Sequence, residues 1–330
     1  MHGIAVIGAG RIGRIHAANA KAHPRLDLKY IVDPVAAAVD DLAAATGAQV
    51  AGLDDALSDR SVAAVVVASS TDTHLDFSVR AIEAGKAVFC EKPLDLDLDK
   101  ARSAEPVLGR SEAPFLLGFN RRFDPNFRKL HERIRSGEMG ALETLHIVSH
   151  DPAPPPIDYV KVSGGMFKDM TIHDFDMARW LLGEEPVEIY AAAAAMVDPA
   201  IEEAGDVDTA KTVLRTESGK ICVISNSRRS GYGYDQRVEA FCSKGLLRAG
   251  NLLSSTVEVW GEEGTRSDAL QNFFLDRYAE AYRAEMAHLV DVLEGKAKPL
   301  IGYGDGIQAL RIAEAAMQSH QSARMVRVDS

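Results

Sequence analysis

Residues 4–13 read IAVIGAGRIG, and this stretch decides the fold of the first part of the chain. Its first four residues are apolar, as in a buried strand, and glycines follow in the spacing Gly-x-Gly-x-x-Gly. Ile15, Ala18 and Ala22 then recur at helical spacing. A strand, a glycine turn and a helix in this order are typical of the phosphate-binding turn of a dinucleotide-binding fold.

Each glycine of this turn has its own expected role. Gly8 would allow the tight turn, Gly10 would let a pyrophosphate approach the backbone, and Gly13 would let the helix and strand pack closely. The phosphates would meet the N–H groups and the positive dipole at the start of the helix. A plain glycine-rich turn is the ordinary alternative, but the flanking strand and helix favour a dinucleotide.

A second apolar strand, residues 28–32, ends in Asp33. This carboxylate is placed to accept hydrogen bonds from the adenosine ribose hydroxyls. It would repel a 2′-phosphate, and Pro34 supplies no arginine to bind one. The sequence therefore predicts NAD rather than NADP as the cofactor.

Further apolar strands follow, and their ends carry polar residues. Residues 62–68 are apolar and rich in β-branched side chains, as in a buried parallel strand, and residues 87–90 and 115–119 form two more. Because a doubly wound sheet binds its ligands beyond the carboxyl ends of its strands, we expect the loop after residue 68 at the cofactor. That loop supplies Ser69, Ser70, Thr71 and His74. We predict an α/β fold that begins with an NAD-binding Rossmann domain over residues 1–120.

Lys92 follows the strand 87–90 within the triplet Glu91-Lys92-Pro93. A lysine at a strand end is commonly a solvated loop residue. Here the strand end faces the cofactor cleft, and Pro93 would fix the turn, with a cis bond as one option. An ammonium group in that place can stabilise a developing alkoxide, provided that a second catalytic group lies downstream.

The pattern of the chain changes after residue 120. A helix is expected over 125–136, and helices over 277–293 and 304–318 end the chain. Strand-like stretches with close turn signals lie between them, at 142–150, 187–196, 207–216, 219–229, 234–242 and 256–260. This spacing predicts a C-terminal α+β domain, residues 121–330, with an open, mostly antiparallel sheet for substrate binding and oligomerisation.

Composition excludes several classes of protein. The formal net charge of −11 argues against nonspecific nucleic-acid binding. No apolar run approaches the roughly 18–20 residues of a membrane helix, and the first residues lack a signal-peptide layout. The three cysteines are widely spaced, which suggests neither a disulfide framework nor a zinc site. We expect a cytoplasmic protein that binds no metal, no nucleic acid and no membrane.

Residues 164–180, GGMFKDMTIHDFDMARW, carry the second candidate group. Read as a helix from about residue 166 to 182, they place Asp169 and His173 four residues apart on one face. An ordinary amphipathic helix is one reading, and a zinc or manganese site is another, although the chain offers no convincing third ligand. With a dinucleotide cleft and Lys92 upstream, proton transfer leads: neutral His173 takes the proton of a substrate hydroxyl, and Asp169 orients the substrate or imidazole.

Three motifs together resemble the Gfo/Idh/MocA family of oxidoreductases. They are the glycine turn of residues 8–13, the triplet 91–93 and the pattern Gly-Gly-x-x-x-Asp-x-x-x-His of residues 164–173. The resemblance covers essentially the whole chain. It implies a catalytic triad of Lys92, Asp169 and His173, NAD dependence and a homotetramer built through the open sheet. The expected cofactor site also includes Arg11 and Ile12 at the helix start and Glu91 and Lys92 at the strand end.

Shorter stretches resemble the inositol 2-dehydrogenase branch of that family, namely residues 119–124, 149–152, 170–176 and 228–236. The branch implies oxidation of the axial hydroxyl of myo-inositol to the 2-keto compound, scyllo-inosose, with His173 as general base. The polyol contacts carried over are Lys92, Arg122, His150, Asp169, His173, Tyr232 and Gln236. The alternatives are a related dehydrogenase for scyllo-inositol or glucose and a sensor that binds NAD without catalysis.

Overall fold

The structure, a computed structural model, describes residues 1–328, and the chain forms two compact units. The first unit contains residues 1–123 and 281–308, and the second contains residues 124–280 and those from 309 onward. The expected boundary after residue 120 lies close to the first of these divisions. The segment 281–308, which the sequence assigned to the C-terminal domain, groups instead with the first unit.

A six-stranded parallel sheet forms the centre of the first unit, as predicted for a Rossmann fold. Its strand order is β3-β2-β1-β4-β5-β6, so the chain reverses direction across the sheet between β1 and β4. Its strands are β1 (His2–Ile7), β2 (Leu26–Val32), β3 (Gln49–Val50), β4 (Val62–Val67), β5 (Ala87–Glu91) and β6 (Phe115–Gly118). The carboxyl ends of β1, β4 and β5 therefore meet at one edge, where the polar loops lie.

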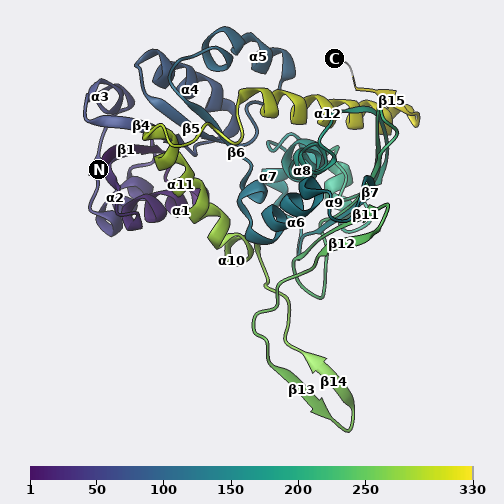
Figure 1. Ribbon diagram of the computed structural model, residues 1–330. Coiled ribbons are helices and arrows are strands. Elements are labelled where there is room, and N and C mark those ends of the chain that lie inside the picture. The colour runs from purple at the N-terminus through teal and green to yellow at the C-terminus, as the bar shows by residue number, and fades with distance from the viewer. Residues whose placement is uncertain (329–330) are drawn as a thin grey trace. The chain divides into compact units, whose positions relative to one another are not determined.

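Helices cover both faces of this sheet, as Figure 1 shows. They are α1 (Arg11–Ala22), α2 (Ala36–Thr46), α3 (Leu53–Ser58), α4 (His74–Glu83), α5 (Leu98–Ser103) and α11 (Ala279–Leu293), with short turns η1 (Thr71–Thr73), η2 (Glu105–Gly109) and η3 (Asn120–Phe123). Met286, Leu289 and Val290 of α11 belong to the same apolar core as Val66 and Phe89 of the sheet. This packing is the reason that the segment 281–308 groups with the first unit.

A seven-stranded sheet forms the centre of the second unit, with strand order β12-β11-β7-β10-β9-β8-β15. Its strands are β7 (Leu142–His150), β8 (Pro186–Ala194), β9 (Thr209–Thr216), β10 (Ile221–Ser227), β11 (Asp235–Cys242), β12 (Gly245–Ala249) and β15 (Val326–Arg327). β10 and β7 pair in parallel, and the other pairs are antiparallel. The predicted α/β fold with a second, mostly antiparallel sheet is thus confirmed.

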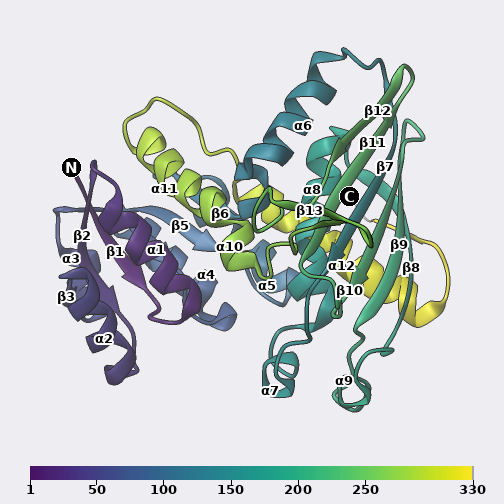
Figure 2. The same ribbon diagram turned by 90° about the horizontal axis from the view of Figure 1, so that it is seen from below.

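Helices α6 and α8 lie along one face of this sheet (Figure 2). The helical segments are α6 (Pro125–Ser136), α7 (Ile157–Val160), η4 (Phe167–Thr171), α8 (Ile172–Leu182), α9 (Pro199–Glu203), α10 (Phe274–Arg277) and α12 (Tyr303–Ser322). The stretch 256–260 does not join the sheet, because β13 (Glu258–Gly261) pairs with β14 (Gly264–Ser267) in a separate exposed hairpin. None of the helices in residues 1–328 has the length and hydropathy that crossing a bilayer requires.

Candidate active site

The three glycines of the first turn occupy three different environments. Gly8 has φ +104°, and a Cβ there would lie 2.4 Å from the carbonyl oxygen of Ala68. A Cβ on Gly13 would lie 1.9 Å from the carbonyl oxygen of Gly8. A Cβ on Gly10 would meet no heavy atom of the described residues within 4 Å. Gly8 and Gly13 are thus required by the protein itself, whereas Gly10 keeps an open approach to the start of α1.

This contrast predicts that two substitutions have separable effects. Gly13→Ala should destabilise the first unit, because its methyl group meets backbone that cannot move aside cheaply. Gly10→Ala should leave the folded state stable and lower dinucleotide affinity, because its methyl group occupies only the space that a pyrophosphate would need. Urea unfolding and NADH fluorescence titration of both variants test this. Equal destabilisation of both would contradict it.

Gly10 is also the N-cap residue of α1, with φ −71° and ψ −171°. Glycine has no side chain to cap the helix, and the first turn of α1 carries no acidic residue. The backbone N–H groups of Arg11, Ile12 and Gly13 stand at this helix start, where an anion is favoured. This donor set fits the pyrophosphate of a dinucleotide.

Asp33 follows β2 and binds the backbone of the glycine turn. Its Oδ2 accepts a hydrogen bond from the Ala9 N–H at 2.7 Å, and its Oδ1 accepts one from the Val35 N–H at 2.8 Å. A carboxylate has about four lone-pair positions, so each oxygen can accept a further bond. Asp33 is therefore held rigidly beside the turn with acceptor capacity left for ribose hydroxyls.

The loops after β4 and β5 are tied to each other by His74. This buried ring has Nδ1 2.7 Å from the carbonyl oxygen of Pro93 and Nε2 3.2 Å from that of Ser69. Burial lowers the pKa of His74. Ser69 in turn bonds Thr73 through their hydroxyls at 2.6 Å. His74 therefore acts within the loop framework, and Ser70 is the most exposed member of the predicted set.

Lys92 follows the last residue of β5, and its peptide bond to Pro93 is cis. Its side chain is half-buried. The preceding residue, Glu91, has its Oε1 2.6 Å from Nε2 of His16, on α1. Glu91 is thus bound to a helix of its own unit.

Asp169 and His173 belong to the second unit, on consecutive helical segments. Asp169 lies in η4, a π-helical turn, so the continuous α-helix expected from residue 166 begins only at Ile172. The Asp169 carboxylate accepts a hydrogen bond from the Tyr159 hydroxyl at 2.8 Å and one from Nη2 of Arg228 at 3.2 Å. Asp169 and His173 are both partly exposed, whereas the helix residues next to His173 are buried.

Asp174 and Asp176, the two other acids of this segment, lie in the interior of the second unit. Each is fully buried. Asp174 accepts a hydrogen bond from Nδ2 of Asn226, on β10, at 2.7 Å, and Asp176 lies 3.7 Å from Nη1 of Arg179. These two acids join α8 to the sheet and to its own next turn, which leaves Asp169 and His173 as the pair available for chemistry.

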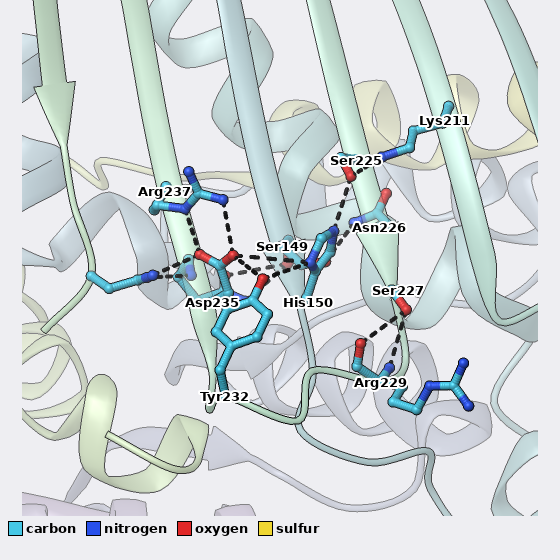
Figure 3. Close-up of polar contacts among 12 residues, drawn as sticks. Ser149, His150, Lys211, Ser225, Asn226, Ser227, Arg229, Tyr232, Asp235 and Arg237 are labelled. Atoms are coloured by element: carbon cyan, nitrogen blue, oxygen red, sulfur yellow. Dashed lines mark hydrogen bonds and ion pairs between the residues drawn. The ribbon is translucent and has the colours of Figure 1, made fainter. Parts of the chain in front are cut away.

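Figure 3 shows a second polar cluster, formed by β7, β9, β10 and β11. Nε2 of His150 lies 2.9 Å from the Ser225 hydroxyl, which Lys211 also contacts. The Tyr232 hydroxyl donates to Oδ2 of Asp235 at 2.6 Å and lies 3.5 Å from Nδ1 of His150. Burial lowers the pKa of His150 and, with the Asp235 hydrogen bond, raises that of Tyr232. The cluster presents a neutral imidazole and a neutral phenol side by side.

Asp235 anchors this cluster from a fully buried position. Burial acts to raise its pKa, but hydrogen bonds from Arg237, Tyr232 and Asn251 outweigh burial and keep the pKa low. Nε of Arg237 lies 2.7 Å from Oδ1 of Asp235, and Nδ2 of Asn251 donates to the same oxygen at 2.7 Å. Asp235 is therefore an anion that fixes the orientation of the Tyr232 phenol.

Arg122 and Gln236, two further predicted substrate contacts, are both buried. Nη2 of Arg122 donates to Oδ1 of Asp305 at 2.9 Å within the first unit. The Gln236 amide bonds the Ser149 hydroxyl, and its Oε1 accepts from the Tyr278 hydroxyl at 3.2 Å. Gln236 is 1% exposed, so its amide serves hydrogen bonds inside the second unit.

Comparison with known proteins decides the family. Residues 2–116 match the oxidoreductase family with an NAD-binding Rossmann fold, Gfo/Idh/MocA, and residues 127–248 match the Gfo/Idh/MocA C-terminal domain. The chain belongs to this family. The resemblance drawn from its motifs is thereby confirmed, and the chain is an NAD-dependent oxidoreductase.

Individual relatives are similar to this chain over nearly their full length. The chain is 43% identical over 323 residues to inositol 2-dehydrogenase of Rhizobium meliloti (strain 1021), covering 98% of both. A crystal structure of a myo-inositol dehydrogenase from Corynebacterium glutamicum superposes with a TM-score of 0.96 at 42% identity, covering 100% of this chain and 99% of that one. A scyllo-inositol dehydrogenase from Lactobacillus casei, with NAD(H) and scyllo-inositol bound, gives 0.93 at 28% identity, covering 100% of both chains.

Three polar residues with a place in these sites were not predicted as site residues from the sequence. Arg228 and Tyr159 hold Asp169, and Asp235 holds Tyr232. Arg228 is the first residue and Asp235 the last but one of the segment 228–236, whose sequence resembled the inositol branch. Tyr159 lies in the short helix α7, and no pattern in its neighbourhood pointed to it.

Proposed function

We propose that this protein oxidises the axial hydroxyl of myo-inositol to the 2-keto compound, scyllo-inosose, with NAD as hydride acceptor. The observation that carries the proposal is the pair Asp169 and His173, which are both partly exposed, with Asp169 oriented by Tyr159 and the buried Arg228. The full-length similarity to inositol 2-dehydrogenase supports myo-inositol as the substrate.

In the proposed mechanism Lys92, Asp169 and His173 act on one substrate hydroxyl. His173 accepts the hydroxyl proton while the C2–H bond breaks, which makes the carbon an effective hydride donor. Asp169, fixed by two donors, orients the substrate or the imidazole, and the Lys92 ammonium stabilises the developing alkoxide. Bound NAD would supply the acceptor for the hydride, and with it the oxidising equivalent of the reaction. The products are the ketone, NADH and one proton, which His173 releases to solvent.

The dinucleotide would bind at the carboxyl edge of the first sheet. The main-chain donors of the glycine turn, including those of Arg11 and Ile12, would take the pyrophosphate. Asp33 would bind the adenosine ribose, and Ser70, Thr71 and Lys92 lie on the adjoining loops. Ser69, His74 and Glu91 support these loops through the bonds described above.

Asp33→Ala tests the cofactor assignment. We expect the variant to lose affinity for NAD and to lose much less for NADP, because the carboxylate both binds ribose hydroxyls and repels a 2′-phosphate. The ratio of kcat/KM for the two cofactors measures the change. An unchanged ratio would reject Asp33 as the selective residue.

The polyol would be recognised by the neutral groups of the second unit and by Arg122. His150 and Tyr232 offer donors and acceptors that suit ring hydroxyls, and Asp235 fixes the phenol. Gln236, which is buried, would act by holding Ser149 next to His150 in β7. Each hydroxyl of a myo-inositol ring can donate one hydrogen bond and accept others, and an imidazole and a phenol can also both donate and accept.

We propose a cytoplasmic homotetramer assembled through the open face of the seven-stranded sheet. Large apolar side chains are exposed on that sheet, among them Tyr190, Phe241 and Leu246. The cysteines, all free thiols buried in the described chain, suit a reducing compartment. Light scattering on the purified protein tests the assembly, and a monomer at assay concentration would reject it.

Initial rates of NAD reduction against a panel of myo-inositol, scyllo-inositol and glucose test the substrate. The proposal predicts the highest kcat/KM on myo-inositol. Preference for scyllo-inositol would instead favour the activity named for the Lactobacillus casei neighbour. If no member of the panel is turned over and NADH still binds, the result would favour a sensor that binds NAD without catalysis.

A further inference from the structure

Three titratable side chains meet inside the first unit, away from its glycine turn. His16 is on α1, Glu91 ends β5, and Glu285 is on α11. Each offers a ligand atom within 4.8 Å of the other two. His16 and Glu285 are fully buried, and Glu91 is 8% exposed. The mechanism proposed above gives no role to His16 or Glu285.

Two members of this cluster are hydrogen-bonded to each other, and the third, Glu285, is not. Nε2 of His16 and Oε1 of Glu91 are 2.6 Å apart, which is a strong hydrogen bond. Among residues 1–328, neither carboxyl oxygen of Glu285 has a hydrogen-bond partner, and nor does Nδ1 of His16. A buried carboxylate without partners is very costly, so Glu285 is a group that keeps its proton.

The surroundings of Glu285 agree with a neutral carboxyl group. Burial, and then the negative charge of Glu91, raise the pKa of Glu285 well above 4.5. His16 is the third titratable member of the cluster, and Tyr282, on α11 itself, is a further titratable group, with its ring centroid 5.7 Å from that of His16. Phe89 of β5 also packs against the imidazole, with ring centroids 5.0 Å apart.

A metal ion fits the cluster less well than a proton. Two atoms bound to one tetrahedral metal at about 2.0–2.2 Å lie more than 3 Å apart. The 2.6 Å separation between His16 and Glu91 is shorter than that. The contact is therefore a hydrogen bond rather than one edge of a coordination sphere.

We propose that Glu285 is a positioning residue that carries a proton at neutral pH and, with His16 and Glu91, fixes the end of β5 from which Lys92 extends. Glu91 immediately precedes Lys92, and His16 is on the helix that begins at the glycine turn. The cluster thus joins the strand that carries the ammonium group to the helix that receives the pyrophosphate. The effect on turnover rests on the role proposed for Lys92.

The direct test is isotope-edited infrared spectroscopy of the full-length protein at neutral pH. Wild type should show the carbonyl stretch of a protonated carboxylic acid, and Glu285→Gln should lose that band. Glu280→Gln, an exposed glutamate on the same helix, is the matched control and should keep it. These spectra need no turnover, so they fail or succeed independently of the proposed function.

Proton linkage gives a second readout. Above pH 4.5, the ordinary value for glutamate, folding must take up a proton at Glu285, so the wild type loses stability as pH rises towards the raised folded-state pKa. Glu285→Gln needs no proton. The folding equilibrium constant of the variant relative to wild type should therefore grow about tenfold per pH unit in that window. A ratio independent of pH would overturn a protonated Glu285.

Kinetics separates positioning from mere structural support. Glu285→Gln keeps the shape and neutrality of the group and should turn over like wild type, whereas Glu285→Ala should lose about 10²-fold in kcat through displacement of Lys92. Full turnover by Glu285→Ala would overturn the positioning role. A wild-type spectrum without the band, or stoichiometric metal that disappears in Glu285→Gln, would overturn the protonated carboxyl group.

Discussion

Replacing His173 with alanine is expected to lower kcat by about 10²- to 10⁴-fold, with the enzyme still folded and still binding NADH. The reason is that the proton of the substrate hydroxyl then has no acceptor of suitable basicity. His173 is partly exposed at the first turns of α8, so its loss should remove little packing. Steady-state NAD reduction, with circular dichroism and NADH titration on the same samples, measures the effect.

His2→Ala is the matched control, because His2 begins β1 and lies 3.5 Å from Glu294 on the surface of the first unit. It should retain wild-type turnover. If His173→Ala also retained near-wild-type turnover, His173 would not be the general base, and another group would have to accept the proton.

Replacing Asp169 with alanine should reduce both turnover and stability. Arg228, 2% exposed, would lose the carboxylate that its guanidinium now pairs with at 3.2 Å. Breaking a buried ion pair by removing one partner costs about 3–5 kcal/mol of unfolding free energy. Turnover should fall by about 10²-fold as well, because the catalytic geometry loses its oriented carboxylate. Urea unfolding and NAD reduction measure the two effects separately.

Tyr159→Phe is the control for this substitution. It removes only the hydrogen bond at the other carboxylate oxygen, from a tyrosine that is 47% exposed, and should cost about 1 kcal/mol or less. If Asp169→Ala were as stable as Tyr159→Phe, the Arg228 pair would not be a structural anchor. Unchanged turnover in Asp169→Ala would remove Asp169 from the mechanism.

The glycine turn shows what local sequence can establish. Gly8, Gly10 and Gly13 have distinct surroundings in the structure, and those of Gly8 and Gly13 agree with the tight turn and the close packing that the spacing indicated. Asp33 could be placed because it directly follows a strand next to the turn. These features depend on residues within about one βαβ unit, where chain order nearly determines position.

Other features required contacts that no local pattern encodes. Helix α11 reads as amphipathic in the sequence, and an amphipathic face does not say which sheet it will cover. The sequence therefore could not predict that Glu285 lies beside His16 and Glu91, which come 269 and 194 positions earlier in the chain. Arg228, which follows β10, and Asp169, which lies in η4, are 59 residues apart and meet only in the folded second unit.

The burial of Asp174 and Asp176 could not be predicted for the same reason. Acids on a helix are most often solvated, and their burial here depends on partners of two kinds. Asn226 comes from a distant strand, whereas Arg179 is local and is itself buried. The contact with Asn226 could not be predicted from the sequence. The contact with Arg179 could have been predicted from the i, i+3 spacing.

The transfer of deuterium from carbon 2 of myo-inositol to NAD tests the central claim most directly. With [2-²H]myo-inositol and unlabelled NAD, the account predicts one deuterium in each NADH, an unlabelled 2-keto product and a primary isotope effect on kcat/KM if hydride transfer limits that step. NADH formed without deuterium would contradict oxidation at carbon 2, and NADH binding without any turnover would contradict the dehydrogenase activity itself.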